Sequence, residues 1–413
     1  MFISSEQYGR ELTPEQKTDI ISNAADNMGD IDFEERMEMT ILEPRCRSEI
    51  HAAMQRMKIE ARQAEIEEMV DLLVGQIGGL VFLLPLFRRS DINEIAINPD
   101  GTLWVMEKGS SYFRRVEEKL DPKDTARAVE AILMPFGRAI NEATVEVSAR
   151  LPKVETLPAL RAGARLHVMH ESVVGRQKFP SVNIRLYEQV PVMPEKLVEW
   201  GVAPEAVIRK LVEAVSKEYR IFVIGGTGSG KTTTLSALCN GIPKTSRVIT
   251  IEDPSEIWIN HPHVVPIEAK KSPHGSTVPS YTLTDGVISA MRMSPHYLVV
   301  GEVRTGHALM ALFNAMMSDH PGLSTYHADS PEAAVRRAVN QAGQDLGIQA
   351  SFTKDAFAMA IDVVVQVGWG RTTGQRGIVG IWEVEYELKG GNVVFDPLFE
   401  MGQDDMRPPT RRE

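Results

Sequence analysis

The sequence predicts a multidomain α/β protein, with helices first, then a small α/β domain, and then a larger domain built on a parallel sheet. Its 413 residues are 43% hydrophobic. Because one core usually serves ~100–200 residues, more than one domain core is expected. Apolar residues recur at helical spacing early in the chain, and short β-type runs follow residue 87. The run IFVI at 221–224 is continuous and apolar, which is typical of a buried parallel strand.

Charge and cysteine content narrow the class of protein. The formal net charge is −11, which argues against a chain that binds nucleic acid through a basic surface. Cys46 and Cys239 are far apart and belong to no CxxC pattern, so we expect neither a disulfide framework nor a thiolate zinc site. Glu6 and Arg10 precede any apolar stretch and argue against a secretory signal. We therefore expect a protein of the reducing cytoplasm.

Residues 1–75 are expected to form an N-terminal helical region. Over 48–74, apolar side chains recur at helical spacing with charges between them, which predicts one amphipathic helix whose methionines pack in the core. The stretch 72–87 carries no charge, but glycines and Pro85 interrupt it. It is also shorter than the ~20 apolar residues that a membrane span needs. We interpret it as a buried helix end that runs into a turn.

Residues 76–188 are expected to form a small N-terminal α/β domain. Asp100 and Gly101 lie between two β-type runs, which is the sequence pattern of a tight hairpin. Asp121 and Pro122 have the character of a helix start. More short strands follow, so this part of the chain mixes both kinds of element.

The rest of the chain is divided by composition. Pro191 and Pro194 stand in a polar setting and predict a linker over 189–198. Residues 199–400 are expected to form the larger domain. The final stretch, 401–413, ends in DMRPPTRRE and is expected to be a disordered tail.

A glycine-rich segment follows the strand at 221–224 and precedes a helix. It matches the pattern GxxxxGK[ST], in which glycine lets backbone N–H groups point at phosphate oxygens. The start of the helix adds its positive end. We expect Lys231 to reach the β- and γ-phosphates and the Thr232 hydroxyl to bind Mg²⁺. A turn without a ligand is the alternative. The residues expected to hold the nucleotide are Gly225, Gly226, Thr227, Gly228, Ser229, Gly230, Lys231, Thr232 and Thr233.

Acidic residues follow two later strands. The run 248–251 leads into Glu252 and Glu256, and the run 298–300 leads into Glu302. The ends of parallel strands are where such a fold places groups for magnesium and for an attacking water, so Glu252 and Glu302 join Thr232 as expected metal ligands. Helix caps or surface acids are the alternative. An NKxD motif for guanine is absent from the sequence, which favours ATP with Mg²⁺.

Four motifs occur in order and carry a family resemblance. They are GGTGSGKTT, TIEDPSEI, LVVGEVRTGHALMALFNAM and GLSTYHADSPEAAVRR. They resemble the Walker A motif, Asp box, Walker B motif and His box of the type II/type IV secretion ATPase superfamily. The similarity covers about residues 76–385, and DINEIAINPDGTLWVMEKG resembles the N-terminal domain of the conjugation-type secretion and tight-adherence (Tad) pilus branch.

The resemblance implies a RecA-like P-loop ATPase domain in a hexameric ring, with ATP held between the two domains. It places Glu302 on the Walker B glutamate and Glu256 on the Asp box glutamate, alongside the Walker A lysine, Lys231. It places His327 on the His box histidine, which is thought to couple the nucleotide state to neighbouring contacts. Which glutamate acts as general base stays open.

The resemblance also assigns three arginines. Arg150, Arg165 and Arg185 match arginines of the N-terminal domain, some of which reach the nucleotide phosphates in relatives. A guanidinium group suits this role because its donors match phosphate oxygens. An ordinary ion pair is the alternative for each of them.

Some residues depart from the family pattern. Pro295-His296 stands where members usually carry Pro-Asp, and Asp329 follows His327 and Ala328 where Asn or a similar residue is common. The four-cysteine zinc module of type II secretion and pilus-extension ATPases is missing from the sequence, which weighs against those branches.

The expected function is that of a cytoplasmic ATPase at the inner face of the membrane, powering pilus assembly or export. Its expected partners are other copies of the chain and an inner-membrane secretion or pilus-platform protein, with no membrane span of its own and no direct nucleic-acid binding. A RecA-like nucleic-acid motor and a slowly hydrolysing, nucleotide-gated assembly scaffold are the alternatives. The cargo stays open between pilin, protein and conjugative DNA.

Overall fold

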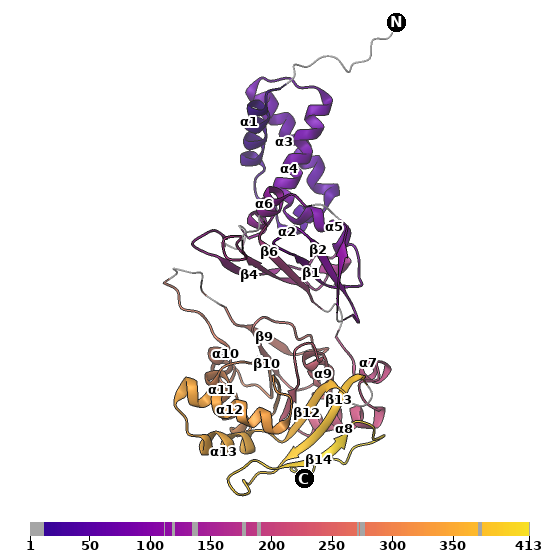
Figure 1. Cartoon of the computed structure of the whole chain (residues 1–413), viewed down its shortest axis with the longest axis vertical. Helices are drawn as coiled ribbons and strands as arrows, with labels where there is room; N and C mark the ends of the chain where they lie inside the picture. Colours follow the sequence, from indigo (N-terminus) through magenta and orange to yellow (C-terminus); the bar gives the residue numbers. More distant parts are fainter. Residues whose placement is uncertain are drawn as a thin grey trace. The chain divides into compact units, whose positions relative to one another are not determined.

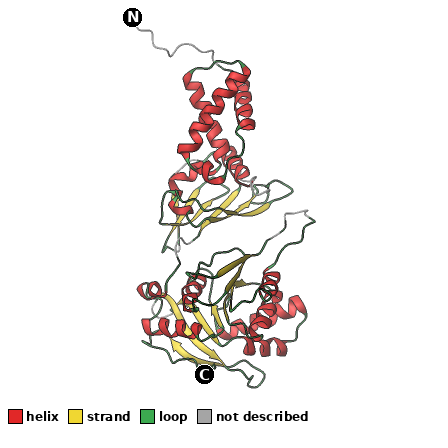
Figure 2. Ribbon diagram, turned by 180° about the vertical axis from the view of Figure 1, so that it is seen from behind, coloured by secondary structure: helices red, strands yellow, loops and turns green. Residues whose placement is uncertain are grey.

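The computed structural model describes residues 12–110, 112–117, 120–133, 139–175, 179–187, 191–270, 272, 277–370 and 374–412. Contacts divide the chain into two units, Met1–Gln189 and Val190–Glu413. The charged start of the chain, on which the expectation of no secretory signal depends, lies outside the described residues. Helices and sheets occur in both units (Figures 1 and 2), and the α/β fold class is confirmed.

The first unit starts with a group of helices that has its own apolar core. The single helix expected over 48–74 is wrong, because Lys58 takes a left-handed conformation (φ 54°) and ends one helix before the next begins. Met54 and Met69 are buried in this core, as expected for packing methionines. The helices are α1 (Pro14–Asn27), α2 (Phe33–Met37), α3 (Met39–Met57) and α4 (Gln63–Gly78).

The apolar stretch at 72–87 forms the end of α4 and two short turns of helix. Gly79 has a φ of +62°, and η2 (Leu80–Leu83) and α5 (Leu84–Phe87) follow it. Leu84 and Phe87 are buried, so the interpretation as a buried helix end that enters a turn is confirmed. Among the described helices, none has the length and apolar content needed to cross a membrane.

An antiparallel sheet completes the first unit. The strand order is β3-β2-β1-β6-β5-β4, and the hairpin between β1 and β2 turns at Gly101 (φ +81°). One face is apolar and packs against α5, α6 and η4, while α4 packs against α6. The expected boundary near residue 75 therefore lies inside one contact unit. The elements are β1 (Ile92–Ile97), β2 (Leu103–Glu107), β3 (Phe113–Val116), α6 (Pro122–Leu133), β4 (Glu146–Leu151), η4 (Pro158–Leu160), β5 (Ala164–Met169) and β6 (Ser181–Leu186).

The second unit is built on a sheet with the order β14-β13-β12-β7-β11-β10-β8-β9. The strands from β12 to β9 run parallel, and β13 and β14 add antiparallel neighbours. All four residues of β7 are buried, as a central parallel strand requires. The strands are β7 (Ile221–Ile224), β8 (Val248–Glu252), β9 (Val264–Glu268), β10 (Tyr297–Val303), β11 (Gly322–Tyr326), β12 (Val363–Trp369), β13 (Arg376–Val384) and β14 (Phe395–Glu400).

Helices cover both faces of this sheet (Figure 2). One face packs on α8 and α9, and the other on α10 to α13. The expected linker, 189–198, overlaps the start of α7, so its second half is helical. The helices are α7 (Pro194–Glu199), α8 (Glu205–Ser216), α9 (Lys231–Leu238), η5 (Cys239–Gly241), α10 (Leu283–Ala290), α11 (Gly306–Met317), α12 (Pro331–Leu346) and α13 (Ala350–Ala360).

The expectation of a disordered tail over 401–413 is wrong for its described residues. Arg411 donates through Nη1 to the carbonyl oxygens of Ile361 (2.6 Å) and Val384 (2.8 Å). The Tyr219 hydroxyl donates to the carbonyl oxygen of Pro409 at 2.9 Å. These long-range contacts hold the segment against the sheet, and composition alone does not reveal them.

Candidate nucleotide site

The glycine-rich loop leaves β7 with a conformation that requires glycine. Gly225 has a φ of +154°, and a Cβ atom there would lie 2.1 Å from the carbonyl oxygen of Val367 on β12. Gly228 (φ +71°) and Gly230 (φ +97°) also lie in the left-handed region, which other residues rarely adopt. The loop therefore packs tightly against β12 and then turns into α9.

Lys231 is the first residue of α9, and its side chain folds back over the loop. Its Nζ donates to the carbonyl oxygen of Gly226 at 2.8 Å, and the Ser229 hydroxyl donates to the same oxygen at 2.9 Å. The residue is only 8% exposed. Burial lowers the pKa of Lys231, and the charge of Glu302 opposes that shift. The side chain is thus part of a packed loop.

Glu302 lies near the end of β10, next to β11, whose neighbour on the other side is β7. Its Oε2 accepts hydrogen bonds from Arg304 Nη2 (2.7 Å) and Nε (3.0 Å). Burial by itself raises the pKa of Glu302, but the bond to Arg304 and the charges of Arg304, Lys231 and His327 outweigh it and lower the pKa. The carboxylate is therefore ionised at neutral pH and faces a positive neighbourhood.

His327 follows β11, at the same edge of the sheet. Thr325, two residues before it, is in register with Glu302 of β10 and with Val223 of β7. Asp329 follows, and its carbonyl oxygen accepts a hydrogen bond from Gln366 Nε2 of β12 at 2.7 Å. The structure thus brings Lys231, Glu302 and His327 together at the carboxyl ends of neighbouring strands.

Glu252 has a structural role in the turn that follows β8. Its carboxylate accepts hydrogen bonds from the backbone N–H groups of Glu256 (2.8 Å) and Ile257 (2.9 Å) and from the Ser255 hydroxyl (3.1 Å). The residue is 2% exposed. Burial raises its pKa to about 7, although these hydrogen bonds lower it. Its expected role as a magnesium ligand is disfavoured, because the turn already uses both carboxylate oxygens.

A magnesium ion would have to be held by few protein atoms. In the part of the chain that the structure describes, no three or more His, Cys, Asp or Glu residues are grouped to hold a metal. Thr232, half-buried in the first turn of α9, and Glu302 offer oxygen atoms. Mg²⁺ commonly takes one or two protein oxygens together with phosphates and water, so this donor set fits it.

Arg150, Arg165 and Arg185 lie in the first unit and form one row. Arg150 pairs with Arg165 across β4 and β5, and Arg165 pairs with Arg185 across β5 and β6. Directly opposite residues of a sheet share a face, and the residues that flank them in sequence are buried on the other face. The Arg150 guanidinium also lies 5.5 Å from the ring centroid of Tyr187. Glu94 of β1 lies directly opposite Arg185 at the end of this row, so the three arginines share this face of the sheet with a carboxylate.

Sequence reasoning missed several residues at the nucleotide site. Arg304 follows Glu302 by two positions, and an ion pair between them could have been proposed from that spacing. Gln366 and Arg376 come from β12 and β13, far along the chain, and no sequence pattern marks them.

His296, at the departure from the family pattern, accepts a hydrogen bond through Nδ1 from the backbone of Arg247 (2.9 Å) just before β10. It lies at the opposite end of that strand from Glu302.

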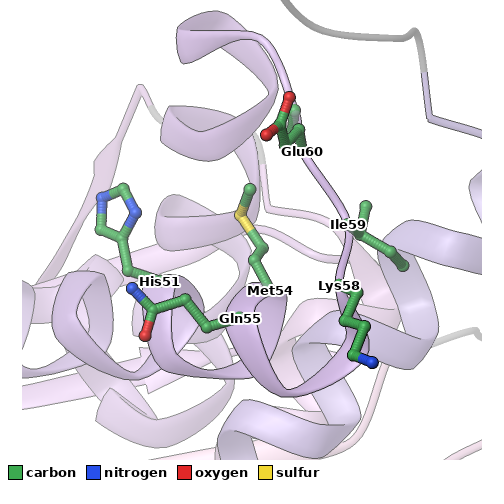
Figure 3. Close-up of a pocket in the computed structure, with 7 residues that line it drawn as sticks. His51, Met54, Gln55, Lys58, Ile59 and Glu60 are labelled. Atoms are coloured by element: carbon green, nitrogen blue, oxygen red, sulfur yellow. The ribbon is translucent and has the colours of Figure 1, made fainter.

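A pocket of about 450 Å³ lies in the N-terminal helices of the first unit (Figure 3). Its lining comes from the end of α3 and the segment that follows. It belongs to the first unit, whereas the glycine-rich loop belongs to the second. The lining residues are His51, Met54, Gln55, Lys58, Ile59, Glu60 and Ala61.

This chain is similar in sequence to one family and to several known proteins. The family described as "Type II/IV secretion system protein" matches residues 136–366. An uncharacterised protein of Methanocaldococcus jannaschii is 28% identical over 352 residues, which are 85% of this chain and 60% of that relative. The type IV secretion system protein VirB11 of Brucella suis is 28% identical over 324 residues, 73% of this chain and 88% of VirB11. This chain thus spans less than two thirds of the Methanocaldococcus relative.

One solved structure adds evidence on the fold. The pilus retraction motor PilT with bound ADP aligns with a TM-score of 0.53 and 17% identity, over 76% of this chain and 83% of that chain. At this identity the likeness bears on the fold alone, and it agrees with the sheet and helices described above.

Proposed function

Because the chain belongs to the type II/IV secretion system protein family, we propose that it hydrolyses ATP to power pilus assembly or export through a type IV secretion or Tad-like machine. The resemblance drawn from the four motifs is confirmed at the level of the family. The observation that carries the proposal is the convergence of the glycine-rich loop, Lys231 and Glu302 at one edge of the parallel sheet. This edge is where α/β folds of this kind bind ligands.

The loop binds the phosphates of ATP. Its backbone N–H groups and the N-terminus of α9 supply positive ends, and Lys231 supplies a full charge. Lys231 Nζ now donates to the carbonyl oxygen of Gly226, and a short movement exchanges that acceptor for a phosphate oxygen. The binding segment runs from Gly225 to Thr233.

Glu302 orients the attacking water. Its carboxylate is ionised at neutral pH because Arg304, Lys231 and His327 lower its pKa, so it can accept a hydrogen bond from the water and orient it. Glu302 and the Thr232 hydroxyl would hold Mg²⁺, which when bound offsets charge on the phosphate oxygens. Glu256 and His327 would act on the site from neighbouring loops. The backbone N–H of Glu256 donates a hydrogen bond to the carboxylate of Glu252.

The arginine row of the first unit completes the site in our proposal. Arg150, Arg165 and Arg185 would bind the phosphates and offset the charge that develops during phosphoryl transfer. The working assembly is a homo-hexameric ring. It would dock at the inner face of the cytoplasmic membrane on a secretion or pilus-platform protein.

ATP hydrolysis by purified protein variants tests the proposal. Lys231→Ala should remove most turnover because the phosphate charge loses its partner. Glu302→Gln should bind ATP yet leave it unhydrolysed, since an amide neither accepts the proton nor carries the charge. Losses of ~10²-fold or more are expected from removing groups of this kind.

Glu213→Gln is the matched control for Glu302→Gln, because Glu213 is an exposed glutamate of α8 that pairs with Lys217 at 3.1 Å. It should hydrolyse ATP at the wild-type rate. Melting temperatures of all variants report on folding. Turnover near the wild-type level in folded Lys231→Ala protein would refute the phosphate assignment, and equal losses in Glu302→Gln and Glu213→Gln would refute the role of Glu302.

A further inference from the structure

The hairpin of β12 and β13 lies against the glycine-rich loop. A Cβ atom at Gly225 would lie 2.1 Å from the carbonyl oxygen of Val367. A Cβ atom at Gly230 would lie 4.0 Å from Cγ1 of the same valine. The Val367 side chain belongs to the apolar cluster that includes Leu235 of α9. The face of β12 that carries Val367 is therefore the face that meets the loop and α9.

Trp369 continues this face of β12 beyond the loop. Residues two apart on a strand point to the same side and are about 6.6 Å apart along it, so Trp369 lies next to Val367 on the same face. The register shifts between Gln366 and Val367, and from Val367 onward the strands pair regularly, with Val367 opposite Ile378 and Trp369 opposite Arg376. Trp369 is 56% exposed, so a large aromatic surface faces solvent close to the phosphate-binding loop.

Arg376 reaches the loop itself. Its Nη1 lies 3.4 Å from the carbonyl oxygen of Gly228. The start of β13 is held in place because the Ile378 backbone N–H donates to the carbonyl oxygen of Val202 at 2.8 Å, and a Cβ at Gly377 would lie 2.5 Å from that same oxygen. Because Trp369 and Arg376 are directly opposite each other, the guanidinium and the indole ring share one face of the hairpin.

We propose that Trp369 and Arg376 form the nucleoside side of the ATP site, with the indole ring stacked on the purine base and the guanidinium bound to the phosphate chain near Gly228. This inference rests on the proposed ATPase function and adds the subsite for the base. The loop and Lys231 recognise phosphates only, and the base needs an aromatic or apolar surface nearby. An exposed indole two residues beyond the loop contact supplies it, because any purine presents a flat face for stacking.

Equilibrium binding of ATP and of inorganic triphosphate separates the two parts of the site. Trp369→Ala should weaken ATP binding about tenfold, the size of effect seen when one base loses an aromatic partner. It should leave inorganic triphosphate binding unchanged, because that ligand has no base. Trp369→Phe should keep most of the ATP affinity. Arg376→Ala should weaken binding of both ligands.

Tryptophan fluorescence gives a second readout. The chain has five tryptophans, and the change in emission on adding ADP should be lost in Trp369→Phe while ADP still binds. Phe352→Ala is the matched control, since Phe352 is 59% exposed on α13, which packs on the other face of the same sheet. It should bind both ligands as the wild type does.

Two results would overturn the subsite. One is wild-type ATP affinity in Trp369→Ala, and the other is an equal loss of ATP and triphosphate binding in that variant. If Lys231→Ala loses both ligands while Trp369→Ala keeps both, the proposed ATP site stands and the subsite alone fails. If the wild type binds neither ligand, the proposed function itself fails.

Discussion

Glu252 is a buried carboxylate that accepts hydrogen bonds from a turn and has a raised pKa. Its pKa is raised to about 7 by burial, from an ordinary value of 4.5. The backbone N–H groups of Glu256 and Ile257 donate to its Oε2. Glu256, a residue of the proposed site, is therefore positioned by a group whose ionisation changes near neutral pH.

This gives a prediction for stability. Between pH 4.5 and about 7 the folded chain keeps a proton on Glu252 that the unfolded chain releases. The free energy of unfolding should therefore fall as pH rises through this window, by ~3 kcal/mol from this group. Glu252→Gln keeps an acceptor for the turn but has no proton to release, so its stability should lack this part of the decline.

Urea unfolding at several pH values on either side of about 7 measures the difference. The gap between wild type and Glu252→Gln should shift in favour of the variant as pH rises. Parallel curves for the two proteins would show that Glu252 titrates in the folded chain as it does in the unfolded chain.

At the scale of elements, the last described residues of the chain belong to an ion-pair cluster in the second unit. The cluster also contains the residues that precede β7 and β12. Asp362, the residue before β12, has a fully buried side chain and forms ion pairs with Arg220 (2.7 Å), Arg411 (3.0 Å) and Arg412 (2.7 Å). Burial raises its pKa, but hydrogen bonds and charge from Arg220, with further charge from Arg412, outweigh it and lower the pKa. Arg220 precedes β7, so the cluster joins the strands that lead to the loop.

We expect Asp362→Asn to lower the free energy of unfolding by ~3–5 kcal/mol, because the buried Arg220 and the half-buried Arg411 and Arg412 lose their counter-charge. Unfolding in urea is the suitable measurement, because urea is uncharged and, unlike guanidinium chloride, does not screen ion pairs. Glu199→Gln is the control, as Glu199 forms an exposed pair with Lys196 and should change stability by less than ~1 kcal/mol. Similar small effects in both variants would mean that the cluster adds little to the fold.

At the scale of the whole molecule, the proposed site draws on both units. Arg150, Arg165 and Arg185 lie in the first, and Lys231 and Glu302 lie in the second. In our proposal both groups of residues serve one nucleotide. A change of arrangement that depends on the γ-phosphate gives a rigid-body motion, which a ring can pass to neighbouring copies.

Arg165→Ala should therefore depress ATP turnover much more than it weakens ADP binding, because ADP lacks the γ-phosphate. Arg161→Ala is the control, since Arg161 is an exposed arginine of the same unit whose Nε donates to the carbonyl oxygen of Glu155 at 3.2 Å. Sedimentation and steady-state turnover across protein concentration test the ring, and activity should rise as it assembles. A wild type that stays monomeric at full specific activity would contradict the ring, and undiminished turnover in Arg165→Ala would contradict the arginine role.

Much of the fold and the candidate loop could be predicted from the sequence because the signals are local. The spacing of glycines before Lys231, the continuous apolar run of β7 and the Asp100-Gly101 turn each depend on a few neighbouring residues. The backbone of such segments has few alternatives, so periodicity and spacing were enough to place the strands at 221–224, 248–251 and 298–300, the loop and the α/β class. The placement of Glu302 at a strand end followed from the same kind of pattern.

Tertiary structure alone decided the features that depend on distant contacts. Lys58 interrupts a pattern that is helical on both sides, Glu252 accepts hydrogen bonds from the turn that follows β8, and Arg411 donates to the carbonyl oxygens of Ile361 and Val384. Trp369 and Arg376 come together beside the loop only through strand register. In each case the deciding free energy comes from burial and hydrogen bonds between segments far apart in the chain, and no local pattern encodes those pairings.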